Sequence, residues 1–160
     1  DGTESIATHG SIMEVSDNIS DYFKFTIVRN PFTRFLSEYF HQKRKKLTNQ
    51  NFEYYIKTVE LKDLHLIPQS YYVNTMMDTS KKLTYIAKYE DYINEVNSLF
   101  KKININENIP HLNRNPIYDK HPSLKQEKYY NSFYTEPWMK DWIRERYRDD
   151  FTLFNYELDI

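Results

Sequence analysis

An arginine and a serine about two helical turns apart are the residues of this sequence best placed to bind an anion. Arg29 ends an apolar segment, and Asn30 and Pro31 follow it as a helix cap and a first helical residue. A strand ending at Arg29 would bring the guanidinium beside the free N–H groups of the next helix. Ser37 lies in that helix, away from its apolar face, and adds a hydroxyl donor. The spacing predicts an anion pocket, with a solvated helix serine as the alternative for Ser37.

The composition excludes several other kinds of site. The chain has 160 residues, no cysteine and only 2 glycines. Disulfides, thiolate metal sites and thiol nucleophiles are therefore excluded, and so are glycine-rich phosphate loops. The 5 histidines show no HExxH or HxH spacing, so no metal site is predicted. The net charge of -1 gives no general attraction for nucleic acid or anionic membranes, so any anion site must be local.

A strand and a helix must position the anion pocket. In residues 22–28, Phe23, Phe25 and Ile27 alternate with other side chains, which predicts a strand buried on at least one face. A helix is predicted to begin at Pro31 and to end in the basic run 43–46. Its apolar stripe consists of Phe32, Phe35, Leu36, Tyr39 and Phe40.

The rest of the chain alternates between helical and strand patterns. Asp91 is expected to cap a helix with Ile93, Val96, Phe100 and Ile103 on one face. We also expect a helix over 52–61, an irregular segment over 65–70, a strand over 83–89, a long loop over 104–128 and a helix over 135–149. The alternation predicts an α/β fold with a parallel sheet flanked by helices, in a single domain spanning 1–160. No run reaches the roughly 18 apolar residues of a membrane span, which indicates a soluble domain without a membrane segment.

Several segments, in the same order along the chain, resemble the PAPS-dependent sulfotransferases. The resemblance is to the branch of carbohydrate (Golgi-type) sulfotransferases and their bacterial relatives. The segments that carry it are VRNP at 28–31 with Ser37, HLIPQ at 65–69, IAKYE at 86–90, HLNR at 111–114 and YRDDFTLFNY at 147–156.

The resemblance implies a P-loop NTPase-like sulfotransferase fold and a sulfuryl transfer. The donor would be 3′-phosphoadenosine-5′-phosphosulfate (PAPS), and the acceptor a hydroxyl, with a carbohydrate as the expected partner. Arg29 and Ser37 match the arginine and serine that hold the 3′-phosphate in that family. As in phosphoryl transfer, positioning and electrostatics would supply the catalysis, and no metal would be needed.

Further roles are expected for three histidines and a second arginine. His9 precedes the strand, where this family can place a histidine, and is expected to be the catalytic base. His65 and His111 lie on the two irregular segments that should border the acceptor cleft, and we expect both to contact substrate. Arg114 is expected to be a second nucleotide contact. The alternative for each is a surface or loop-packing residue.

The family's loop for the 5′-phosphosulfate, a lysine followed by glycine and hydroxyl residues, has no counterpart here. Residues 2–5, GTES, share some of its composition but lack the lysine. We expect this chain to lack the N-terminal strand and loop of the fold. A noncatalytic sulfotransferase-like domain that binds carbohydrate or nucleotide is therefore the main alternative.

Other properties stay open at this point. A nucleic-acid module is disfavoured by the balanced charge and by the lack of a recognisable motif. The sequence does not name the acceptor or the oligomeric state. A cytoplasmic location is expected if the chain is of the bacterial type, and the Golgi lumen if an N-terminal anchor has been removed.

Overall fold

The computed structural model describes residues 19, 21–60, 64–73, 82–107 and 126–159. Its elements, in chain order, are β1 (Phe25–Val28), α1 (Pro31–Arg44), α2 (Phe52–Thr58), η2 (Leu64–Leu66), α3 (Gln69–Val73), β2 (Tyr85–Lys88), η4 (Tyr89–Asp91), α4 (Tyr92–Lys102), α6 (Gln126–Asn131), α7 (Pro137–Arg146) and α8 (Arg148–Leu153). Within these ranges no helix is long and apolar enough to cross a membrane.

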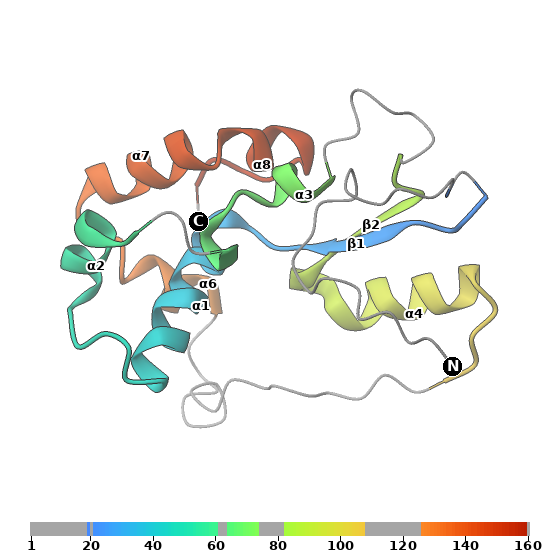
Figure 1. The fold of residues 1–160 in the computed structure, drawn as a ribbon, viewed down its shortest axis with the longest axis horizontal. Coiled ribbons are helices and arrows are strands. Elements are labelled where there is room, and N and C mark those ends of the chain that lie inside the picture. Colours follow the sequence, from blue (N-terminus) through green and yellow to red (C-terminus); the bar gives the residue numbers. More distant parts are fainter. Residues whose placement is uncertain (1–18, 20, 61–63, 74–81, 108–125, 160) are drawn as a thin grey trace.

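The sheet consists of β1 and β2, which pair in parallel with Phe25 opposite Tyr85 and Val28 opposite Lys88. Helix α4 packs against β2, whereas α7 and α8 lie toward the carboxyl ends of the strands, where α7 contacts α1 and α8 contacts α3 (Figure 1). The prediction of an α/β fold with parallel strands and flanking helices is confirmed. Arg29 follows the carboxyl end of β1, and Tyr89 follows the carboxyl end of β2. Because the strands are parallel, the two residues lie at the same end of the sheet.

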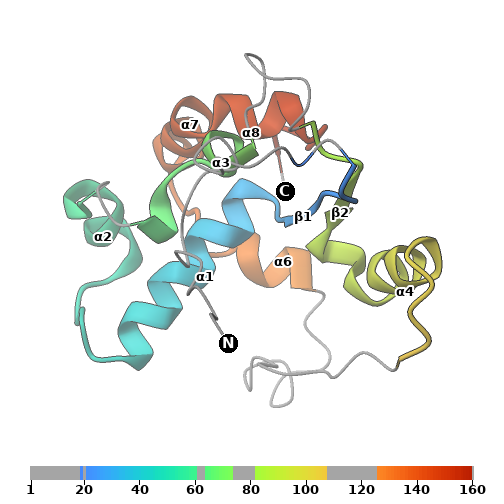
Figure 2. The same cartoon turned by 45° about the vertical axis from the view of Figure 1, so that its right-hand side comes forward.

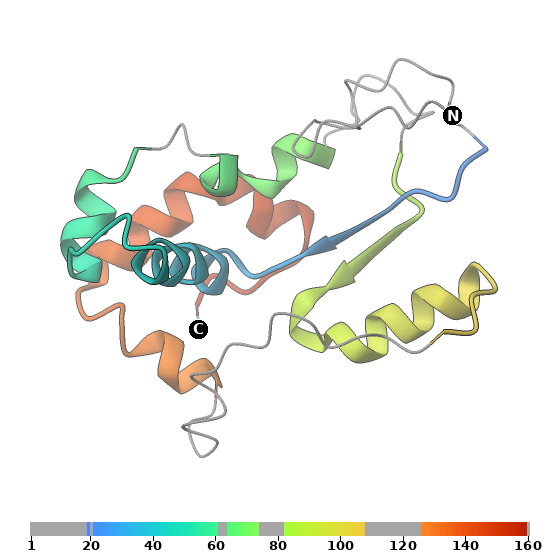
Figure 3. The same ribbon diagram turned by 60° about the horizontal axis from the view of Figure 1, so that its bottom comes forward.

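Helix α1 begins where the sequence predicted. The Asn30 side chain accepts a hydrogen bond from the Phe32 N–H at 2.9 Å, and Pro31 occupies the first helical position. β1 leads directly into α1, which runs away from the strands (Figure 3). The helix ends at Arg44, inside the predicted basic run, where positive side chains interact favourably with the helix dipole.

An aromatic core surrounds α1, which lies between α6 and α7 (Figure 2). Four residues of the predicted stripe, Phe32, Phe35, Leu36 and Tyr39, are buried, and Phe40 is partly buried against them. The other buried members of this cluster are Phe52, Tyr55, Ile56, Leu66, Tyr130, Tyr134, Met139, Ile143, Tyr147 and Phe151. Burial of this apolar face, more than helix propensity, is what stabilises so long a helix.

The carboxyl-terminal helix differs from its prediction. The expected single helix over 135–149 is two helices, because α7 ends at Arg146 and α8 begins at Arg148. Tyr147 lies between them with non-helical dihedral angles, φ −114° and ψ 27°. Helix α6 also begins inside the predicted loop, at Gln126.

Two details of burial also differ. In α4 the buried residues are Val96 and Leu99, whereas Ile93 is exposed. The buried face of this helix is therefore turned relative to the face that the sequence predicted. In β1 the buried residue is Val28, while Phe25 and Ile27 remain exposed. The strand is therefore buried at its carboxyl end, next to Arg29, where the functional residues lie.

Candidate anion-binding site

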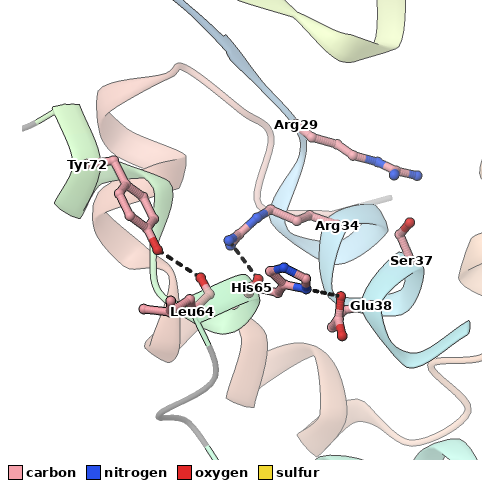
Figure 4. Close-up of a pocket in the computed structure, with 7 residues that line it drawn as sticks. All are labelled: Arg29, Arg34, Ser37, Glu38, Leu64, His65 and Tyr72. Carbon is pink, nitrogen blue, oxygen red and sulfur yellow. Dashed lines mark hydrogen bonds and ion pairs between the residues drawn. The ribbon is translucent and has the colours of Figure 1, made fainter. Parts of the chain in front are cut away.

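A pocket of about 290 Å³ opens where β1 ends and α1 begins. Three residues predicted from the sequence, Arg29, Ser37 and His65, line it together (Figure 4). Its other lining residues are Arg34, Glu38, Leu64 and Tyr72. In Figure 4 the Arg29 and Ser37 side chains project to the same side of α1, whereas Arg34 turns toward η2. The structure thus brings the two predicted anion donors into one space.

The Arg29 guanidinium is held in place by three neighbouring side chains. Its Nε donates to Thr33 Oγ1 at 3.0 Å, and an Nη2 hydrogen is donated to the Tyr130 hydroxyl at 2.9 Å. The Tyr89 ring lies 4.6 Å from the guanidinium carbon, within cation–π range. A guanidinium has five N–H donors. The remaining donors have no partner in the described part of the chain, so they are free for an anion.

The backbone at Arg29 is bonded by the side chain of a residue far along the chain. Gln69 Oε1 accepts from the Arg29 N–H at 2.9 Å, and Gln69 Nε2 donates to the Arg29 carbonyl at 2.8 Å. Both polar groups of this peptide segment are therefore satisfied by one amide.

A second pair of side chains bonds the residues on either side of Arg29. Glu90 Oε1 accepts from the Asn30 N–H at 2.8 Å, and the Tyr156 hydroxyl lies 3.1 Å from the Val28 carbonyl. That hydroxyl is also 2.9 Å from Glu90 Oε2. Burial, followed by the nearby Glu90 charge, raises the pKa of Tyr156 far above its usual value, so the hydroxyl remains protonated.

Asp150 connects this region to α3. Its side chain is fully buried, and it accepts from the Gln69 N–H at 2.9 Å and the Ser70 N–H at 2.7 Å. Gln69 Nε2 lies 3.4 Å from the same carboxylate. The buried charge is thus satisfied by the first N–H groups of α3.

Arg34, Glu38 and His65 form the opposite wall of the pocket. Arg34 Nη2 donates to the carbonyls of His65 and Ile67, at 2.7 and 2.8 Å. His65 Nδ1 lies 3.1 Å from a Glu38 carboxylate oxygen. The turn that carries His65 is therefore fastened to α1 by two side chains.

Some of the N–H groups at the start of α1 are already bonded within the chain. The sequence suggested that free N–H groups at the start of α1 would share the anion site. Instead Asn30 caps the Phe32 N–H and Glu90 takes the Asn30 N–H, while Pro31 has no N–H. The positive charge of the pocket therefore comes from side chains, Arg29 foremost.

The remaining predicted residues, His9, His111 and Arg114, lie outside the described residues. Their roles as base, substrate contact and nucleotide contact stay predictions. Among the residues that the structure does describe, no group of three or more His, Asp or Glu side chains is arranged to hold a metal ion.

Sequence reasoning had assigned no role to several residues around Arg29. Gln69, Glu90, Asp150 and Tyr156 belong to segments whose only signal in the sequence is their resemblance to a family. Thr33, Tyr89, Tyr130 and Arg34 were also missed. The one local signal was the presence of Thr33 and Arg34 in the first turns of α1, close to the predicted pocket.

The comparison with protein families agrees with this geometry. The model of the Sulfotransferase family matches residues 4–157, which is nearly the whole chain. The chain therefore belongs to the Sulfotransferase family, whose P-loop-like α/β fold is consistent with the parallel sheet and flanking helices described above. No curated protein and no solved structure matches the chain.

Proposed function

We propose that this chain is a PAPS-dependent sulfotransferase that transfers a sulfuryl group to a hydroxyl of a carbohydrate. Arg29 and Ser37 bind the 3′-phosphate of the donor, and PAPS supplies the sulfuryl group. The observation that carries the proposal is the pocket at the end of β1, which Arg29 and Ser37 line together. The chain's membership of the Sulfotransferase family supports the same interpretation.

The chemistry of the pocket suits a phosphate. Arg29 offers guanidinium N–H groups that its neighbours leave free, and charge-assisted bonds from arginine to phosphate are strong and directional. Ser37 adds a neutral hydroxyl donor, and Arg34 adds a second positive charge to the lining. The Glu38 carboxylate is paired with His65, which reduces its repulsion of an anion when the histidine is protonated.

The other predicted residues complete the proposal. His65 contacts the substrate from η2, and His111 does so from the second irregular segment. Arg114 is a second nucleotide contact. His9 is the base that takes the proton from the acceptor hydroxyl, because an imidazole titrates near neutral pH.

Isothermal titration with adenosine 3′,5′-bisphosphate, the product that remains after PAPS gives up its sulfuryl group, tests the proposal. We expect the chain to bind it, and Arg29→Ala to weaken binding by about 1.5 to 3 kcal/mol, the scale of a hydrogen bond to a charged group. Arg148→Ala is the matched control, because Arg148 is an exposed arginine on α8 paired only with Glu145 in the described residues.

Equal affinity in the folded wild type and Arg29→Ala would reject Arg29 as the phosphate ligand. No binding by the folded wild type would reject donor binding by this chain and leave the noncatalytic alternative. Circular dichroism of each variant confirms that the chain is folded before titration.

A further inference from the structure

We infer that Gln69, Glu90, Asp150 and Tyr156 are positioning residues that fix the backbone around Arg29 and thereby aim its guanidinium into the pocket. This inference rests on the proposed function, since it assumes that Arg29 binds the donor phosphate. The four residues come from three segments that are distant in sequence. Gln69, Glu90 and Tyr156 bond residues 28–30 directly, and Asp150 acts through Gln69.

The first step concerns the end of the strand. The pairing of β1 with β2 ends at Val28, so the N–H and C=O of Arg29 have no partner in the sheet. Buried or half-buried peptide groups need a hydrogen-bond partner. The Gln69 side chain supplies both, at 2.9 and 2.8 Å, and acts as a one-residue extension of the sheet. The peptide of Arg29 therefore cannot rotate without breaking two bonds.

The second step concerns the orientation of Gln69 itself. A free glutamine amide can turn about its side chain, but this residue is fixed at both ends. Asp150 holds its backbone N–H at 2.9 Å and lies 3.4 Å from its Nε2. An apolar residue would fill a core position without the cost of burying a carboxylate. Among the described residues, the side chain of the fully buried Asp150 bonds only the N–H groups of Gln69 and Ser70 and approaches the Gln69 amide, and a role in orienting Gln69 explains its presence.

The third step concerns the residues that flank Arg29. Glu90 Oε1 accepts from the Asn30 N–H, and the Tyr156 hydroxyl lies within hydrogen-bond distance of the Val28 carbonyl and of Glu90 Oε2, which share its single hydrogen. Displacement of the strand end in either direction therefore breaks at least one of these bonds. With Thr33 and Tyr130 holding the guanidinium, both the origin and the tip of the Arg29 side chain are fixed.

A ligand binds more weakly when the side chain that holds it must first become ordered. Contacts that hold Arg29 in place before binding should therefore raise the affinity. We expect Gln69→Met, which keeps the length of the side chain but makes no hydrogen bond, to weaken adenosine 3′,5′-bisphosphate binding about tenfold. Tyr156→Phe should weaken binding about threefold to tenfold, since it removes the hydroxyl that Val28 and Glu90 share and keeps the ring.

A double-mutant cycle separates positioning from general destabilisation. If Gln69 acts through Arg29, then Gln69→Met should change affinity by less than about twofold in the Arg29→Ala background. Ligand-observed NMR measures the weak binding of that pair. A full tenfold loss in both backgrounds would overturn the inference, because the effect would not pass through Arg29.

Two matched variants control for the loss of similar groups elsewhere. Gln50→Met removes a glutamine whose Oε1 accepts, within the described part of the chain, only from Thr58. Tyr39→Phe removes a tyrosine hydroxyl bonded to the Gln50 carbonyl. Both should bind adenosine 3′,5′-bisphosphate as the wild type does. If they weaken binding as much as Gln69→Met and Tyr156→Phe, a general effect of stability explains the data and the inference fails.

The two hypotheses fail in different ways. An unchanged affinity in Arg29→Ala rejects the proposed function and, with it, this inference. A loss in Arg29→Ala together with wild-type affinity in both Gln69→Met and Tyr156→Phe rejects only the positioning role. Should Gln69→Met not fold, the outcome for Tyr156→Phe decides.

Discussion

At the scale of single residues, Arg29 is held in place before any ligand binds. Thr33, Tyr89 and Tyr130 each contact its guanidinium, and none of them is a carboxylate side chain. A carboxylate in their place would neutralise the guanidinium and compete with an incoming phosphate. Hydroxyl and aromatic partners orient the group and leave its charge available.

Ser37 tests how much of the affinity comes from the neutral donor. Ser37→Ala should reduce the affinity for adenosine 3′,5′-bisphosphate by about 0.5 to 1.5 kcal/mol, the net value of one hydrogen bond. The loss should be smaller than that of Arg29→Ala, since no charge is removed. Titration calorimetry measures both. Ser132→Ala, at an exposed serine bonded to the Tyr129 carbonyl, is the control and should bind normally. A loss in Ser37→Ala as large as in Arg29→Ala would contradict this division of roles.

At the scale of elements, the junction of β1 and α1 fixes the geometry of the pocket. The cap of α1 is unusual in that Asn30 is nearly buried and its own N–H is bonded by Glu90. Helix α2 has a comparable cap, because the side chain of Asn51 accepts from the Tyr54 N–H at 2.8 Å. Asn51, however, is exposed and is not among the residues that line the pocket. The two caps therefore form a natural comparison.

Asn30→Ala should lower the free energy of unfolding by about 1 to 2 kcal/mol and also weaken adenosine 3′,5′-bisphosphate binding, because the start of α1 shifts. Asn51→Ala should cost about 0.5 to 1 kcal/mol, with unchanged binding. Urea unfolding and calorimetry measure the two effects. If both variants lose affinity equally, or neither does, the cap of α1 has no particular role in the pocket.

The elements that the sequence predicted well are those with local signals. Asn30 and Pro31 mark the start of α1 by their own chemistry, and the structure confirms that start. The break at Tyr147 has no such signal. Buried residues continue at helical spacing through Ile143, Tyr147 and Phe151, so periodicity alone predicts one helix where there are two.

At the scale of the whole molecule, the pocket depends on contacts between distant parts of the chain. Sequence reasoning identified Arg29, Ser37 and His65, and the structure places all three at one pocket. Sequence reasoning did not identify the side chains that hold the backbone around Arg29. Gln69 is 40 residues from Arg29, and Tyr156 is 128 residues from Val28. No spacing rule links such residues, since only the packed fold brings them together.

The core of the molecule is also rich in tyrosine hydroxyls that must find partners. The Tyr134 hydroxyl donates to the Phe32 carbonyl at 2.7 Å, and the Tyr147 hydroxyl donates to the Leu66 carbonyl at 2.9 Å. Both bonds connect carboxyl-terminal elements to those that surround the pocket. Each bond needs a protonated hydroxyl, which makes the fold sensitive to alkaline pH.

The stability of the chain should therefore fall steeply above pH 10. Burial raises the pKa of Tyr147 to about 12 and that of Tyr134 well above its usual value. In the unfolded chain a tyrosine ionises near pH 10. Above that pH the unfolded state loses protons that the native state keeps, so unfolding becomes more favourable as the pH rises toward the native pKa. For each of these tyrosines, the free energy of unfolding should fall by about 1.4 kcal/mol between pH 8 and pH 11.

Tyr147→Phe isolates one of these contributions. It should be less stable than the wild type at pH 8 by about 1 kcal/mol, because the bond to Leu66 is lost. Between pH 8 and pH 11, however, it should lose about 1.4 kcal/mol less than the wild type does. Tyr54→Phe is the control, because it removes an exposed tyrosine hydroxyl of α2 rather than a buried one. Urea titrations at the two pH values provide the free energies. An equal loss in the wild type and in Tyr147→Phe would show that the buried hydroxyl is not what makes the fold sensitive to alkali.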